Sequence, residues 1–287
     1  MTLRAATRSS PLARLQTDLV ARRLEEPVEQ LHVDTVGDRT QATNTPLHRI
    51  GGQGVFVKEV QAAVLDGRAD FAVHSAKDLP SRRTPGLVIA AFPLRGDPRD
   101  ALVGCALRDL PRGARVATGS VRRRAQLAAL RSDLRFHELR GNMHTRIEKA
   151  AGFDAIVAGA AGLTHLGLDV HISERLDPSV MLPQVGQGAL AVECREGDEA
   201  TIELLHQIDD LQVRACVEME RAFLARLGSG CDLPVAALAG IDESGTLSIE
   251  GLIASIDGAT VVRGVGSDGC ALADRLLDEG GTALLER

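Results

Sequence analysis

Hydrophobic residues in the N-terminal part of the chain recur at alternating strand and helix spacings. Ser10 and Pro11 mark a helix start, because serine can cap the first turn and proline needs no backbone N–H at the first helical position. The predicted elements are strands over 3–7, 31–36 and 70–75 and helices over 11–24 and 56–65. This β-α-β order predicts an open, mostly parallel sheet.

A second series of the same kind follows. Its predicted elements are strands over 115–118, 134–139 and 154–158, a helix over 121–130 and a helix that opens at Asn142. The glycine-rich run 183–188 then precedes a strand over 189–195, which can return to the first sheet. Such a return makes the first domain discontinuous, a common way to build two lobes with paired hinges.

The C-terminal segment has a different pattern, with strand-like runs joined by short Asp-Gly and Ser-Gly turns that are typical of hairpins. Its predicted elements are a helix over 213–227, strands over 235–241, 246–255 and 260–265, and a closing helix over 271–285 interrupted at Gly280. We therefore expect an α/β protein with two αβ lobes and a small α+β third domain that contains a three-stranded antiparallel sheet. The predicted domains are 1–93 with 189–206, 97–184, and 211–287.

The composition excludes several classes of function. Trp and Tyr are absent and aromatic residues total 2%, which removes the stacking platforms of single-strand nucleic-acid binders. No apolar run approaches the roughly 18 residues of a membrane span, and the N-terminus lacks the apolar core of a signal peptide. We expect a cytoplasmic protein without nucleic-acid or membrane partners.

The five cysteines are odd in number, widely spaced and free of CxxC pairs, so the sequence indicates neither a disulfide framework nor a metal site. Cys231 lies between Gly230 and Asp232 on a polar connector, where a thiol can be reached. The other cysteines fall in strand-like or helical runs, and we expect them to be small core residues. They are Cys105, Cys194, Cys216 and Cys270.

Positive charge is concentrated in one segment. The net charge is −6, yet residues 107–149 contain eleven Lys or Arg against four Asp or Glu. In an acidic protein this favours a small polyanionic ligand over duplex nucleic acid, for which a basic domain is expected. A solvated basic face is the alternative.

Two predicted helix starts carry this charge, one over 118–123 and one over 140–146. Backbone N–H groups at a helix N-terminus attract anions, and arginines beside them strengthen the attraction. Lys77 and Asp78 end a predicted strand, where a half-buried carboxylate can work as an acid or stabilise a cation. A plain turn before Pro80 explains the same two residues.

Eight ordered stretches that span essentially the whole chain resemble the porphobilinogen deaminase family, also called hydroxymethylbilane synthases. They are residues 6–13 (ATRSSPLA), 52–59 (GQGVFVKE), 72–80 (AVHSAKDLP), 120–123 (SVRR), 139–142 (LRGN), 158–163 (AGAAGL), 183–189 (PQVGQGA) and 230–231 (GC). The resemblance implies two periplasmic-binding-protein-like lobes with a hinge. It also implies a monomeric transferase of tetrapyrrole synthesis, which deaminates four porphobilinogen molecules and joins them into hydroxymethylbilane for uroporphyrinogen-III synthase.

The resemblance implies, further, a dipyrromethane cofactor held as a thioether by Cys231, with Asp78 as the catalytic carboxylate. It implies cofactor contacts from Ser75, Lys77, Asp78, Thr118, Ser120, Arg122, Arg123, Arg140 and Gly141. It implies substrate contacts from Arg8, Ser10, Gln16, Phe56, Arg146 and Gln187. Arginines suit this task because a guanidinium binds a planar carboxylate with two hydrogen bonds.

The chain departs from the family pattern at Gln53, where a lysine is frequent, and at Gln184, where a small residue is frequent, while Arg49 keeps the charge of a lysine. Arg124 is an additional charge whose contacts the sequence does not define. Two other functions fit parts of the pattern. A periplasmic ligand receptor would share the lobes but requires an export signal, and a nucleic-acid-binding regulator would use the basic segment.

Overall fold

The computed structural model describes residues 2–39, 54, 56–228 and 233–285, and these residues form two compact units. The first contains residues 1–96 and 188–214, and the second contains residues 97–187 and 215–287. The return of the chain to the first sheet after residue 187, expected from the sequence, is confirmed by the pairing of Leu190–Arg195 with Phe71–Ser75.

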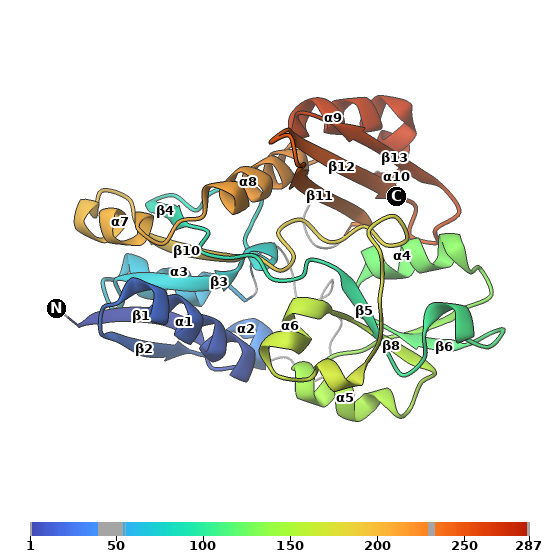
Figure 1. Cartoon of the computed structure of the whole chain (residues 1–287), viewed down its shortest axis with the longest axis horizontal. Helices are drawn as coiled ribbons and strands as arrows, with labels where there is room; N and C mark the ends of the chain where they lie inside the picture. Colours follow the sequence, from blue (N-terminus) through green and yellow to red (C-terminus); the bar gives the residue numbers. More distant parts are fainter. Residues whose placement is uncertain (1, 40–53, 55, 229–232, 286–287) are drawn as a thin grey trace. The chain divides into compact units, whose positions relative to one another are not determined.

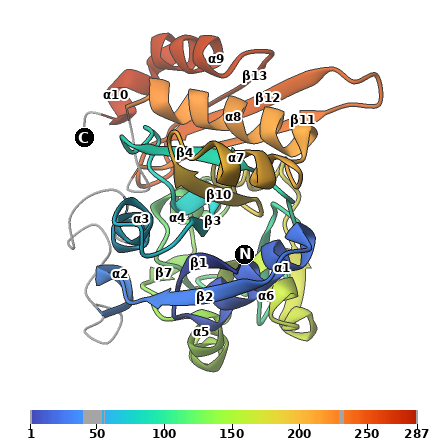
Figure 2. The same cartoon turned by 90° about the vertical axis from the view of Figure 1, so that its left-hand side faces the viewer.

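The first unit is built on a five-stranded sheet with helices on both faces. Helix α1 packs on one face together with α7, α3 covers the other, and Figure 2 shows α1 and α3 on opposite sides. The strands in spatial order are β2 (Val28–Val33), β1 (Leu3–Arg8), β3 (Phe71–Ser75), β10 (Leu190–Arg195) and β4 (Leu87–Ala91). The helices are α1 (Pro11–Leu24), α2 (Val36–Arg39), α3 (Lys58–Leu65) and α7 (Glu199–His206).

The second unit repeats this arrangement. Its five-stranded sheet carries α4 on one face and α5 and α6 on the other. The strands in order are β7 (Arg135–His137), β6 (Arg115–Ala117), β8 (Ala155–Gly159), β5 (Asp100–Val103) and β9 (Ile172–Arg175). The helices are α4 (Val121–Leu130), α5 (Met143–Ala150) and α6 (Ala160–His165). In each sheet four strands run in the same direction, and the fourth in order runs antiparallel to both of its neighbours.

The same unit contains a three-stranded antiparallel sheet with its own core. Helices α8, α9 and α10 pack on this sheet through Phe223, Leu272 and Leu284, and Figure 1 shows α9 and α10 beside its strands. The strands are β11 (Val235–Ile241), β12 (Leu247–Ala254) and β13 (Val261–Gly266), and the helices are α8 (Leu211–Arg226), α9 (Gly269–Leu276) and α10 (Thr282–Leu285). These features confirm the expected α/β fold with two αβ lobes and a small α+β part.

Several sequence expectations need correction. Four of the five strands in each large sheet run in the same direction, as expected of a mostly parallel sheet, but the sequence did not predict that β10 and β5 each insert in the opposite direction. The strand expected over 31–36 is Val28–Val33, because its register follows β1 from Leu3 onward. Cys194 and Cys216 are buried as expected, but Cys105 is only half-buried and Cys270 is exposed. Cys270 occupies the first turn of α9 and lies off the face that buries Leu272 and Leu276.

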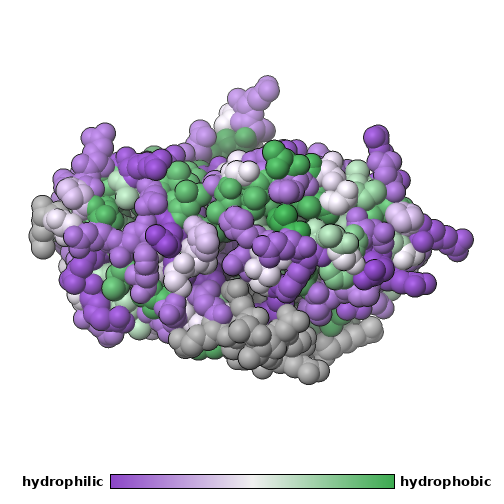
Figure 3. All heavy atoms as spheres, turned by 90° about the horizontal axis from the view of Figure 1, so that it is seen from below, coloured by the Kyte–Doolittle hydropathy of each residue, from purple (hydrophilic) through white to green (hydrophobic). Residues whose placement is uncertain are grey.

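Figure 3 shows one face of the molecule, on which hydrophilic side chains predominate and hydrophobic ones form scattered groups. Among the residues described, no helix combines the length and the apolar character needed to cross a membrane.

The turn between β12 and β13 lies directly on α4. A Cβ atom added at Gly258 would lie 2.3 Å from the carbonyl oxygen of Ala125 and 2.7 Å from the backbone nitrogen of Ala129. Ala125 also shares a buried apolar cluster with Leu252 and Ala254 of β12. The C-terminal sheet therefore supports the helix that begins with Arg122 and Arg123.

Gly258→Ala tests this support. The φ angle of 73° and the contact with α4 both oppose a side chain, so we expect the free energy of unfolding to fall by about 3 kcal/mol. Gly245→Ala is the matched control, since Gly245 has a φ of 83° in the other hairpin turn but no neighbour within 4 Å, and about 1 kcal/mol is expected. Thermal unfolding followed by circular dichroism measures both. Equal shifts for the two variants would contradict the docking of this turn on α4.

Candidate functional site

In the first unit, candidate residues gather where parallel strands end. Arg8 is the last residue of β1, and Ser10 follows as the cap of α1, where its side chain accepts a hydrogen bond from the backbone N–H of Ala13. Ser75 ends β3, and its hydroxyl donates to Oε1 of Gln16 on α1 at 3.1 Å. Ligands of open α/β sheets bind beyond the carboxyl ends of strands.

Asp78 ends a short 3-10 turn, Ala76–Asp78, directly after β3. Its carboxylate is half-buried and makes no hydrogen bond or ion pair with any residue that the structure describes. The backbone of the turn is held instead, since the N–H of Ala76 donates to the carbonyl of Ala189 at 2.9 Å and Leu79 is buried. Asp78 is therefore a carboxylate held by its backbone and available to a ligand.

Arg8 has partners on both sides of its guanidinium. Its Nε donates to Oδ2 of Asp38 at 3.1 Å, and the guanidinium lies 4.3 Å from the centre of the Phe56 ring. Burial opposes ionisation of Asp38, but the hydrogen bonds and charge of Arg8, with Thr35, hold the pKa of Asp38 below its usual value. The structure thus brings Arg8 and Phe56 together.

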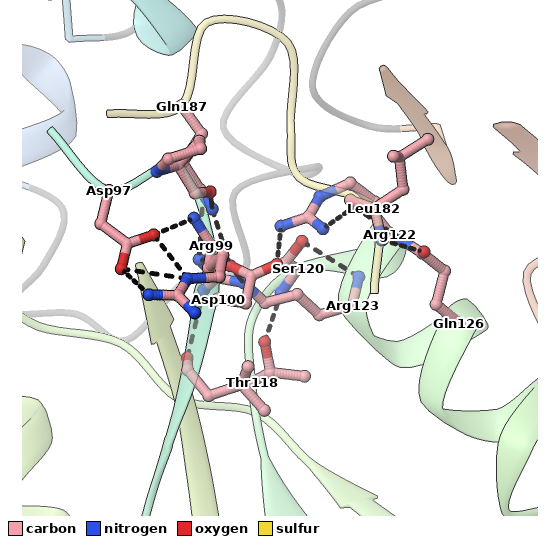
Figure 4. A network of polar contacts seen from close by, with 12 residues as sticks. Asp97, Arg99, Asp100, Thr118, Ser120, Arg122, Arg123, Gln126, Leu182 and Gln187 are labelled. Atoms are coloured by element: carbon pink, nitrogen blue, oxygen red, sulfur yellow. Dashed lines mark hydrogen bonds and ion pairs between the residues drawn. The ribbon is translucent and has the colours of Figure 1, made fainter. Parts of the chain in front are cut away.

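In the second unit, four candidate or neighbouring side chains form one buried polar network (Figure 4). Nη2 of Arg122 lies 2.8 Å from Oδ2 of Asp100, while Nε and Nη2 of Arg123 lie 2.9 and 2.8 Å from Oδ1. Nε2 of Gln187 also donates to Oδ1 of Asp100 at 2.9 Å and to the carbonyl of Pro98 at 2.7 Å. Asp100 is fully buried, and both arginines are less than 10% exposed.

This network contains one negative charge and two positive charges. Burial opposes ionisation of Asp100, yet the charges of Arg122 and Arg123 and the hydrogen bond from Gln187 hold its pKa below the usual value. Burial lowers the pKa of Arg122, against the attraction of Asp100. Because an arginine does not lose its proton in proteins, the network keeps an excess of positive charge.

The two arginines use their donors differently. All three nitrogens of Arg123 have protein acceptors, which include the carbonyl of Val157 at 3.1 Å. Arg122 donates through Nη1 to the carbonyl of Leu182 at 2.7 Å, but its buried Nε and Nη2 make no aligned hydrogen bond in the described part of the chain. The short approach of Nη2 to Asp100 is therefore an ion pair with poor alignment.

A second arginine with an unpaired buried donor lies on the neighbouring strand end. Arg140 is 6% exposed, and its Nη1 has no hydrogen-bond partner among the described residues. Burial lowers the pKa of Arg140, and the charge of Glu138 acts in the opposite direction. Gly141 has a φ of 122°, and its carbonyl accepts from Nε of Arg146 at 2.8 Å. Nζ of Lys149 donates to the carbonyl of Arg140 at 3.1 Å.

Backbone contacts hold the two helix starts close together. The N–H of Thr118 donates to the carbonyl of His137 at 2.9 Å, and a Cβ at Gly119 would lie 3.0 Å from the carbonyl oxygen of Leu139. Thr118 accepts from the N–H of Ser120 at 3.2 Å, and Ser120 caps α4 by accepting from the N–H of Arg123. Buried guanidinium donors and two capped helix starts thus form a candidate site for anions, and carboxylates match its donors chemically.

The structure places the predicted residues in two groups, one in each unit. Lys77 is half-buried beside Asp78. Arg124, whose contacts the sequence left open, is exposed, with its guanidinium 5.8 Å from the centre of the Phe136 ring. Cys231, Arg49 and Gln53 lie outside the described residues.

Asp100 and Asp38, the counter-charges of the predicted arginines, were not predicted from the sequence. One signal was present for Asp100, because it opens the apolar run Ala101–Val103 and a carboxylate in such a run needs a partner. The sequence does not identify that partner.

Among the described cysteines, the thiols differ in reactivity. Burial, with the nearby charge of Asp198, raises the pKa of Cys194 to about 11, so this thiol stays protonated at neutral pH. Cys216 is also buried, whereas Cys270 is exposed on α9.

Asp100→Asn tests the charge balance of the network. It leaves two buried guanidinium groups without a counter-charge, so we expect the free energy of unfolding at pH 7 to fall by about 3 kcal/mol or more. The pKa of Asp100 is lowered in the folded protein, so its contribution is complete above the unfolded value of 3.8 and is lost in more acidic solution. The difference in melting temperature between wild type and variant should therefore narrow only below that pH.

The control for this prediction is Asp97→Asn, which removes a neighbouring carboxylate that pairs with Arg99 at the surface. It should cost about 1 kcal/mol at most, because partly exposed ion pairs contribute little. An Asp100→Asn protein as stable at pH 7 as this control would contradict the network's role.

Comparisons with known proteins agree over nearly the whole chain. A family model described as "Porphobilinogen deaminase, dipyromethane cofactor binding domain" matches residues 3–203. A second, "Porphobilinogen deaminase, C-terminal domain", matches residues 214–276. Among solved structures, a putative methionine-binding lipoprotein from Bacillus subtilis covers 75% of this chain and 92% of its own, with a TM-score of 0.44 and 12% identity.

Curated relatives give the same family. The porphobilinogen deaminase of Roseiflexus sp. (strain RS-1) is 49% identical over 301 aligned residues, which cover 99% of this chain and 98% of the relative. That of Roseiflexus castenholzii is 47% identical and covers 99% and 98%. Both identity and coverage are too high for a shared fold alone, and the chain belongs to the porphobilinogen deaminase family.

Proposed function

We propose that this protein is a hydroxymethylbilane synthase, which removes ammonia from four porphobilinogen molecules and joins them head to tail. The observation that carries this proposal is the set of buried guanidinium donors on Arg122 and Arg140 that make no aligned hydrogen bond within the described part of the chain. Porphobilinogen is a pyrrole with an acetate and a propionate side chain, so each unit brings two carboxylates that can accept from these donors. A nucleic-acid-binding regulator would expose its arginines instead of burying them.

A dipyrromethane cofactor fits the same residues. Each of its two pyrroles carries carboxylates, and the network around Asp100 has an excess of positive charge that a carboxylate would balance. When bound, it supplies the pyrrole carbon to which the first substrate unit is joined. We propose that Cys231 holds it covalently, and that the following residues contact it: Ser75, Lys77, Asp78, Thr118, Ser120, Arg122, Arg123, Arg140 and Gly141.

Asp78 has the properties required of the catalytic carboxylate. Loss of ammonia from the aminomethyl group of a substrate leaves positive charge that is delocalised onto the pyrrole nitrogen. The carboxylate of Asp78 is half-buried, held by its backbone and without a partner among the described residues, so it can stabilise such a charge without first breaking a bond to any of them. It can also accept a hydrogen bond from the pyrrole N–H.

Substrate carboxylates have a second set of candidate partners in this proposal. Asp38 and Phe56 hold the guanidinium of Arg8 in one orientation, which lowers the entropy lost when a ligand binds. The amide of Gln187 is 1% exposed and engaged with Asp100, so its effect on binding would act through the orientation of Arg123. The residues proposed to bind the substrate are Arg8, Ser10, Gln16, Phe56 and Arg146, which would contact it, and Gln187, which would act through Arg123.

We propose three functional parts: residues 1–93 with 189–206, which contain Asp78; residues 97–184, which contain the buried arginines; and residues 211–287, which contain Cys231. We also propose that the protein acts in the cytoplasm as a monomer, and that uroporphyrinogen-III synthase consumes its product.

Intact mass spectrometry before and after addition of porphobilinogen tests the proposed function directly. A covalent dipyrromethane, and mass steps of one pyrrole unit after addition of substrate, are expected. A protein that stays at the bare mass even after incubation with preassembled hydroxymethylbilane would overturn the proposal.

Cys231→Ser should fold normally but carry no covalent cofactor, because a serine hydroxyl is a far weaker nucleophile than a thiolate. Cys270→Ser is the matched control, since Cys270 is the exposed thiol in the described part of the chain and should be dispensable. Peptide mapping of both variants locates the adduct. Retention of the cofactor by Cys231→Ser would move the attachment to another thiol.

Asp78→Asn should fold and keep the cofactor, with kcat lower by about 100-fold or more, because an amide cannot balance the positive charge that develops on the substrate. Production of hydroxymethylbilane measures the rate, and intact mass measures the cofactor content. Asp66→Asn makes the same change at an exposed carboxylate in the same unit and should leave kcat unchanged. A fully active Asp78→Asn enzyme would remove Asp78 from the mechanism.

A further inference from the structure

The turn that contains Asp78 lies between two residues that are linked to the same buried carboxylate, one directly and the other through a glutamine. His74 comes four residues before Asp78 on β3, and Thr84 follows the turn by six residues. Since the Asp78 carboxylate has no partner of its own in the described chain, its position depends on the backbone between these two anchors.

Both anchors lead to Glu193 on β10. Nε2 of His74 lies 3.1 Å from Oε2 of Glu193, and the same oxygen accepts a hydrogen bond from Nε2 of Gln61 at 2.8 Å. The hydroxyl of Thr84 donates to Oε1 of Gln61 at 3.1 Å. We call these four residues, His74, Gln61, Thr84 and Glu193, the Glu193 cluster.

The register of the sheet explains why the cluster forms. In the antiparallel pair, Glu193 is opposite Ala72 and Ala191 is opposite His74, so Glu193 and His74 project from the same face of neighbouring strands. Helix α3 packs on that face through Val60 and Val64 and contributes Gln61. The hydroxyl of the next residue, Ser75, reaches Gln16 on α1 instead.

Because the cluster is buried, its contacts fix the positions of β3 and α3 relative to Glu193. Glu193, Gln61 and His74 are 3%, 4% and 6% exposed. A buried carboxylate needs partners, because removing it from water without them costs several kcal/mol. Nε2 of His74 is close enough for an ion pair with Glu193 when the imidazole is protonated, although its N–H is not well aligned for a hydrogen bond. Movement of β3 or α3 would separate the carboxylate from these partners.

We propose that Glu193 is a positioning residue for the reaction: through His74 at one end and Gln61 with Thr84 at the other, it holds the turn that presents Asp78. This inference rests on the proposed function, in which Asp78 touches the substrate. Glu193 itself contacts no reacting atom, since it lies within the sheet behind the turn. Its effect is on the precision with which the Asp78 carboxylate is placed, and a misplacement of about 1 Å can lower a rate about 100-fold.

The test is Glu193→Gln in cofactor-loaded protein. The amide oxygen can still accept from Gln61, but the negative charge beside Nε2 of His74 is lost. We expect kcat per loaded enzyme to fall at least tenfold while KM changes less than twofold, because the buried arginines of the second unit are untouched. Glu196→Gln is the matched control, as Glu196 is exposed just beyond the end of the same strand, and wild-type kcat is expected.

The possible results distinguish a failure of this inference from a failure of the proposed function. A loaded Glu193→Gln enzyme with wild-type kcat and a lowered melting temperature would overturn the inference, because the cluster would then serve stability alone. A wild-type protein that takes up no porphobilinogen would instead contradict the proposed function, and the parallel mass measurement separates the two cases.

Two further variants keep the test decisive if Glu193→Gln does not fold. Thr84→Val removes only the half-buried hydroxyl that ties the far end of the turn to Gln61, and we expect kcat to fall about threefold with KM unchanged. His74→Asn should lower kcat at least tenfold, and in combination with Glu193→Gln it should lower kcat no further than the more severe single variant. Wild-type kcat in both Thr84→Val and His74→Asn would overturn the inference.

Discussion

The sharing of the buried carboxylate of Asp100 between Arg122 and Arg123 is the constraint on which the anion site depends. A single carboxylate makes two buried guanidinium groups tolerable, yet it leaves one positive charge unbalanced. The two arginines differ in how their donors are used: every nitrogen of Arg123 has a protein acceptor, while Arg122 keeps buried donors that have no aligned acceptor among the described residues. A second acid in the network would cancel the excess charge, and the absence of Asp100 would leave both arginines uncompensated. The affinity for carboxylates that we propose would therefore follow from the excess of positive charge in this network.

The two five-stranded sheets have the same order and the same antiparallel fourth strand, although no repeat is visible in the sequence. The shared topology brings helix starts to the carboxyl ends of equivalent strands, so Ser10 after β1 and Ser120 after β6 cap helices in equivalent positions. The chemistry placed there differs. In the first unit the turn after β3 presents a carboxylate, and in the second unit the helix starts after β6 and β7 present buried arginines. The same strand order therefore presents a negatively charged side chain in the first unit and positively charged side chains in the second.

Local signals account for what could be predicted from the sequence. The bounds of α1 and α4 follow from Ser-Pro and Gly-Ser starts and a clear apolar period, and both helices were predicted to the residue. The strands β4, β5 and β9 were missed because they are short and are defined by neighbours distant in sequence. The arginines of the site were predicted from their density and from the family motifs.

The counter-charge of these arginines was not predicted. Asp100 lies more than twenty residues from Arg122 in the sequence, and only the pairing of β5 with β8 brings it beneath α4. Likewise, Glu193 meets His74 only through the register of β10.

The two units also hold their functional groups by different means. Asp78 has no side-chain partner among the described residues, so its placement is carried by backbone hydrogen bonds and by buried contacts behind the turn. Arg122 and Arg123 are held through their own guanidinium groups, which contact Asp100, Leu182 and Val157. These two ways of holding a side chain match the chemistry proposed for Asp78 and for the arginines. A carboxylate that stabilises a transient cation is most effective when its oxygens are uncommitted, because no bond must break as the charge appears. Arginines that hold carboxylates through repeated cycles benefit from a fixed orientation, since the entropy of ordering a long side chain is lost once, during folding, rather than at each binding event.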